Sequence, residues 1–60
     1  MDIYERRKMN IKKLQEWYSR KYGGDTISEA TAWEILRATE TWGHSIFAAA
    51  YDILMGDEPQ

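Results

Sequence analysis

The chain has 60 residues, a net charge of −2, one histidine and no cysteine. A domain of this length buries only about 60% of the surface that its unfolded chain exposes, so its stability is marginal. Disulfides are excluded, and a zinc site, which needs about four ligands rich in His and Cys, is disfavoured. A hydrophobic content of 43% with three Trp and four Tyr excludes a disordered chain. We expect one helical domain over 1–56, with 57–60 as a frayed acidic tail.

The net charge conceals two halves of opposite sign. Residues 1–22 carry seven Lys or Arg and three acidic residues, a net charge of +4, whereas residues 23–60 carry one Arg and seven acidic residues, a net charge of −6. Antiparallel packing of the two halves with complementary rims is the favoured interpretation, and contact between the basic half and nucleic acid is the alternative.

The first residues, MDIYERRKMNIKK, contain charges but no apolar run that would form a secretory signal. The longest apolar run, 46–51, is far shorter than the roughly 20 residues that span a bilayer. We therefore expect a cytoplasmic protein without a membrane role.

Helical periodicity begins with residues 3–22. At about 100° per residue, the apolar side chains of this segment fall on one stripe. The stripe consists of Ile3, Tyr4, Ile11, Leu14, Trp17, Tyr18 and Tyr22, with Arg7 and Lys21 at its edges. Gly23 and Gly24 follow directly, and glycine accepts the left-handed backbone that ends a helix. The segment is thus predicted to be an amphipathic helix that stops at these glycines.

A second helix is predicted to begin near Ile27. Thr26 is in position to cap it, and Glu29 lies three residues further on, as in a capping box. Gly56 and Pro59 end the helical pattern after Met55.

Gly43 lies within this second segment and either breaks the helix or weakens it by about 1 kcal/mol. Two apolar stripes cross Gly43 without a change of phase, which favours one long helix with a kink. The favoured fold is therefore all-α, a helical hairpin whose long second helix is kinked at Gly43, dimerising into a four-helix bundle. The alternative is a three-helix bundle broken at Gly43.

The long second segment has an apolar arc of about 220°, whereas a surface helix needs a stripe of only about 100°. The first helix covers one stripe, and the other requires a partner. We expect a homodimer whose self-association interface consists of Ile35, Trp42, Ile46, Ala49 and Ile53.

Catalytic chemistry is not expected. His44, Ser45 and Asp52 supply the residue types of a hydrolytic triad, but adjacent helical positions do not face each other. No metal, cofactor or phosphate-binding motif is present, and we expect no small-molecule substrate.

The remaining function is a non-enzymatic protein–protein interaction module that acts as a small regulator or inhibitor, a role typical of short proteins encoded by phages and mobile elements. Its expected partner-facing acidic surface comprises Glu29, Glu34, Glu40 and Asp52. The alternative is a nucleic-acid-binding regulator, in which phosphates contact the basic first helix through Arg6, Lys8, Lys12, Lys13 and Arg20.

Overall fold

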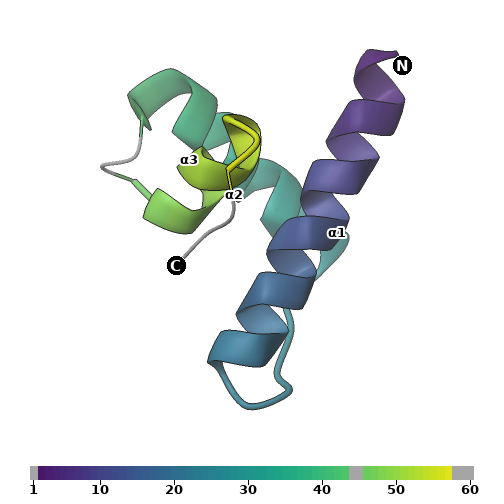
Figure 1. Ribbon diagram of the computed structural model, residues 1–60, viewed down its shortest axis with the longest axis vertical. Helices are drawn as coiled ribbons and strands as arrows, with labels where there is room; N and C mark the ends of the chain where they lie inside the picture. The colour runs from purple at the N-terminus through teal and green to yellow at the C-terminus, as the bar shows by residue number, and fades with distance from the viewer. Residues whose placement is uncertain (1, 44–45, 58–60) are drawn as a thin grey trace.

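The computed structural model describes residues 2–43 and 46–57, and these residues form three helices and no strand (Figure 1). The helices are α1 (Ile3–Lys21), α2 (Glu29–Trp42) and α3 (Ala48–Leu54). The predicted all-α class is confirmed.

Helix α1 has the predicted boundaries to within one residue. The Asp2 carboxylate accepts a hydrogen bond from the Glu5 N–H at 2.8 Å and caps the first turn. At the other end, the Gly24 N–H donates to the Ser19 carbonyl at 2.8 Å, while Gly23 adopts a φ of +68°. This arrangement is the glycine-dependent helix ending that the sequence predicts.

Helix α2 begins two residues later than predicted, and its cap is Ser28 rather than Thr26. The Ser28 hydroxyl accepts a hydrogen bond from the Thr31 N–H at 3.2 Å. The connection before it is bound to α1, because the Gln15 side chain donates to the Ile27 carbonyl at 3.0 Å. The hydroxyl of Thr26, the predicted cap, instead lies 3.5 Å from the carbonyl oxygens of Gln15 and Ile27.

The predicted continuous second helix is wrong. Gly43 ends α2 with φ 75° and ψ −168°, a backbone conformation that is essentially restricted to glycine, and α3 begins only at Ala48. The described residues thus follow the alternative, a break at Gly43. The apolar stripes keep their phase across Gly43 although the helix ends there, because each of the two separate helices carries apolar residues at helical spacing. His44 and Ser45 lie outside the described residues.

The break lets α3 pack against both other helices. All three helices contribute to one buried cluster, which consists of Leu14, Ala32, Leu36, Ala50 and Ile53. Small residues from α2 and α3 allow close approach of the backbones at this cluster. The buried Thr39 hydroxyl donates to the Ile35 carbonyl at 2.7 Å, so the polar group next to the core is satisfied.

Replacing Gly43 by alanine distinguishes the broken from the continuous helix. Because Gly43 adopts a conformation that alanine rarely reaches, G43A should lower the free energy of unfolding by about 1–3 kcal/mol. A continuous helix would instead be stabilised by about 1 kcal/mol. Urea denaturation measures the difference, with T41A in the exposed last turn of α2 as the control for helix propensity; a stabilised G43A protein would contradict the break.

Candidate functional site

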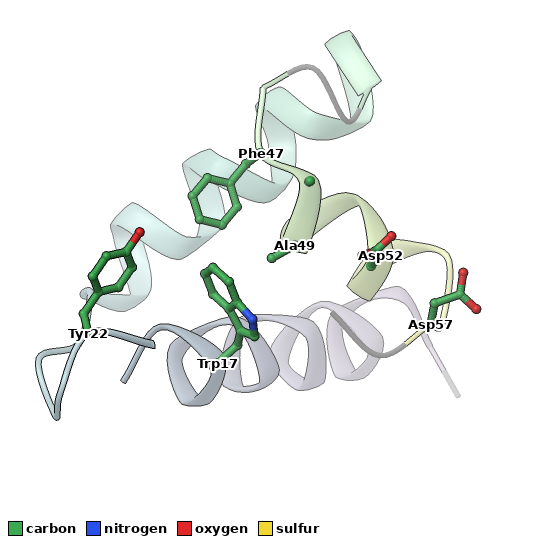
Figure 2. A pocket seen from close by; sticks show the side chains of 7 residues that line it. Trp17, Tyr22, Phe47, Ala49, Asp52 and Asp57 are labelled. Carbon is green, nitrogen blue, oxygen red and sulfur yellow. The ribbon is translucent and has the colours of Figure 1, made fainter. Parts of the chain in front are cut away.

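Three aromatic side chains meet where the end of α1 faces the start of α3 (Figure 2). The Trp17 and Phe47 rings lie 5.6 Å apart between centroids at 87°, and the Trp17 and Tyr22 rings lie 6.4 Å apart at 84°. Both are edge-to-face pairs, a geometry that the ring quadrupoles favour. Trp17 is therefore the centre of an aromatic corner and joins the start of α3 to α1.

The aromatic corner borders an open hollow of about 680 Å³ between α1 and α3, which we call the aromatic groove. The three aromatic residues line one part of it, and Asp52 and Asp57 line the part farther from the rings (Figure 2). It is lined by Trp17, Tyr22, Phe47, Ala48, Ala49, Asp52 and Asp57.

Hydrogen bonds at the end of α3 bring the two carboxylate residues together. The Asp57 N–H donates to the Asp52 carbonyl at 2.8 Å, and the Gly56 N–H donates to the Ile53 carbonyl at 3.1 Å. With Gly56 at a φ of +83°, this is a Schellman ending, which folds the chain back over the last turn of the helix. Asp57, which we expected in the frayed tail, thereby joins Asp52 on the α3 side of the groove.

A second hollow continues from the aromatic groove, since Trp17 and Asp57 line both. Its α1 side carries Lys13, Arg20 and Lys21, with Glu16 among them. The combined depression thus has a basic rim on α1 and an acidic rim on α3. Among the described residues, no group of three or more His, Cys, Asp or Glu is placed to hold a metal ion.

The predicted self-association interface is divided between the core and the surface. Ile53 and Ala49 are 2% and 7% exposed and belong to the interior of this chain, and the partly buried Ile35 packs against the core cluster that contains Ile53. Trp42 and Ile46, in the middle of the predicted stripe, are 68% and 50% exposed. The single stripe that the sequence predicted is therefore not one surface.

The predicted acidic surface is also dispersed. Glu40 forms an ion pair with Arg7, and Glu29 lines a hollow with Lys8 and Lys12 of α1. Glu34 is exposed elsewhere on α2, whereas Asp52 lines the aromatic groove. Of the four residues, Asp52 alone lies in that groove.

The predicted nucleic-acid contacts are all exposed on α1, but they occupy different sides of it. Lys8 and Lys12 line the hollow beside Glu29, whereas Lys13 and Arg20 line the hollow beside Asp57. Arg6 lines a further hollow next to Glu40. Each group thus has a carboxylate of this chain among its neighbours, which weakens the attraction for phosphates.

Arg7 is the important contact that sequence reasoning missed. Its guanidinium carbon lies 4.7 Å from the centroid of the Trp33 ring, and its Nη2 donates to the Glu40 carboxylate. The arginine side chain is only 19% exposed, and its Nη1 is buried without a hydrogen-bond partner among the described residues. The position of Arg7 at the edge of the apolar stripe was the signal available in the sequence.

No family model, curated protein or solved structure matches this chain. Within the described residues, none of the helices combines the length and the apolar character needed to cross a membrane.

Removing the Arg7 side chain should destabilise the fold although the residue is charged. R7A loses an ion pair, a cation–π contact and the packing of the alkyl stem, so we expect a loss of about 1–2 kcal/mol. R7K should recover only part of this loss, because an ammonium lacks the planar guanidinium that lies over Trp33. Thermal and urea denaturation measure both variants. The exposed neighbour provides the control R6A, and equal stability of R7A and R6A would contradict the assignment.

Proposed function

We propose that this protein is a non-enzymatic helical interaction module that self-associates and binds a protein partner, acting as a small regulator or inhibitor of a larger macromolecule. The observation that carries the proposal is the exposure of large apolar side chains at the end of α2 and in the connection to α3. Trp42 and Ile46 form this exposed surface, which we call the α2–α3 corner.

The size of the core supports association. Among the described residues, the buried cluster contains three large aliphatic side chains, Leu14, Leu36 and Ile53, beside two alanines. A core of this size supplies no more than roughly 3–5 kcal/mol without disulfides, a metal or an oligomeric partner. Covering a tryptophan and an isoleucine contributes further at about 25 cal/mol per Å² of apolar surface. Association through the α2–α3 corner would therefore stabilise the protein.

Ile3 in the first turn of α1 is a further exposed apolar residue. It is 82% exposed and lines a hollow with Glu40, which lies two residues before Trp42 in α2. A two-fold interface is formed by the same surface patch of both copies, so the α2–α3 corner alone is sufficient for a dimer.

Sedimentation of the purified chain tests self-association. At about 50 µM, a dimer with micromolar affinity should be well populated. The double variant W42S/I46S removes the apolar atoms of the α2–α3 corner and should sediment as a monomer with an unchanged helical circular dichroism spectrum.

The control is I3S/M55S, which makes two equally polar changes at exposed positions outside the α2–α3 corner. This control should dimerise like the parent chain. A monomeric parent chain would overturn self-association, and loss of the dimer in both double variants would overturn the assignment of the interface.

A further inference from the structure

We infer that the aromatic groove binds a lysine or arginine side chain of a protein partner, with the alkyl stem against the rings and the cationic head at Asp52 and Asp57. The inference rests on the proposed function and identifies the chemistry of a surface separate from the α2–α3 corner.

The rings supply the first part of the argument. Trp17 is nearly perpendicular to both Tyr22 and Phe47, so ring edges and faces border the same hollow from different directions. The Tyr22 side chain is 50% exposed, which leaves part of its surface accessible from solvent. Ring faces attract ammonium and guanidinium groups, and their carbon surfaces accept the alkyl stem of Lys or Arg.

The carboxylates supply the second part. Asp52 and Asp57 line the groove at the C-terminal half of α3, and the Schellman hydrogen bonds hold the Asp57 backbone beside that of Asp52. The C-terminal end of a helix also carries negative partial charge, which adds to the attraction for a cation. Among the described residues, no Lys, Arg or His lines the aromatic groove, and the cations nearest to it, Lys13, Arg20 and Lys21, line the neighbouring hollow that Asp57 also borders.

The charges of the neighbouring hollow restrict the orientation of the partner. Lys13, Arg20 and Lys21 lie toward α1, with Glu16 among them, so a cationic head is repelled from that side and directed toward α3. A partner with an acidic residue next to its Lys or Arg would complement both the basic rim on α1 and the acidic rim on α3. A uniformly basic segment would complement only the acidic rim.

Protein NMR tests the inference with a neutral tripeptide pair, N-acetyl-Gly-Lys-Gly-amide and its norleucine counterpart, which lacks the ammonium. The indole N–H signal of Trp17 is the reporter, and W33F and W42F identify it by elimination of the other two tryptophans. We expect a saturable shift with the lysine peptide, with a dissociation constant of about 1–10 mM, and at least about fivefold weaker binding of the norleucine peptide.

A matched pair of charge variants locates the site. D52N/D57N removes two carboxylates from the groove and should weaken lysine binding by about fivefold or more, whereas E29Q/E34Q removes two from α2 and should change it less than about twofold. The dispersion of the amide spectrum verifies the fold of each variant.

Three outcomes would overturn the inference: no shift at Trp17, equal binding of the lysine and norleucine peptides, or equal weakening by the two double variants. A single-stranded oligonucleotide that shifts Trp17 while the lysine peptide does not would assign the hollow to nucleic acid instead. Failure here leaves the sedimentation result unaffected, because that experiment depends on Trp42 and Ile46.

Discussion

The backbone conformation of Gly43 is the constraint on which the rest of the structure depends. A positive φ combined with an extended ψ ends α2 and redirects the chain, so that α3 packs against the two longer helices. The packing of α3 against α1 and α2 buries Ala50 and Ile53, and it places the Phe47 ring against the Trp17 ring. The core and the aromatic groove therefore have the same origin. A straight second helix would have separated the residues that form both.

Individual polar contacts join α1 to α2, rather than a general attraction between the basic and the acidic half of the chain. Arg7 pairs with Glu40 and lies over Trp33, while Gln15 binds the Ile27 carbonyl near the opposite ends of the two helices. These contacts run in opposite chain directions, in agreement with antiparallel packing of the basic and acidic halves. The partly buried guanidinium contributes through its planar shape and its stem as well as through its charge. Arg7 and Glu40 thus contribute to the packing of α1 against α2.

The burial pattern changes what the apolar residues mean for function. Five residues at helical spacing suggested one interface, but Ala49 and Ile53 stabilise this chain's own core while Trp42 and Ile46 remain on its surface. Helical periodicity predicts that a side chain lies on an apolar face. It does not predict whether that face packs against the same chain or against a partner. The aromatic groove was missed for a related reason: Trp17, Phe47 and Asp57 are far apart in sequence, and only the return of α3 brings them together.

The sequence by itself determined the helical class, the limits of α1 and the glycine endings, because these depend on local propensities and on backbone freedom at particular residues. The absence of cysteine and the opposite net charges of the two halves also follow directly from the sequence. Tertiary structure decided whether Gly43 ended or only bent a helix, since that choice depends on the free energy gained when α3 packs against α1 and α2. It also decided that Ser28 caps α2, that Arg7 is a packing residue and that Asp52 and Asp57 share one rim. Each of these outcomes depends on contacts between segments that are far apart in the sequence, and local sequence patterns do not contain that information.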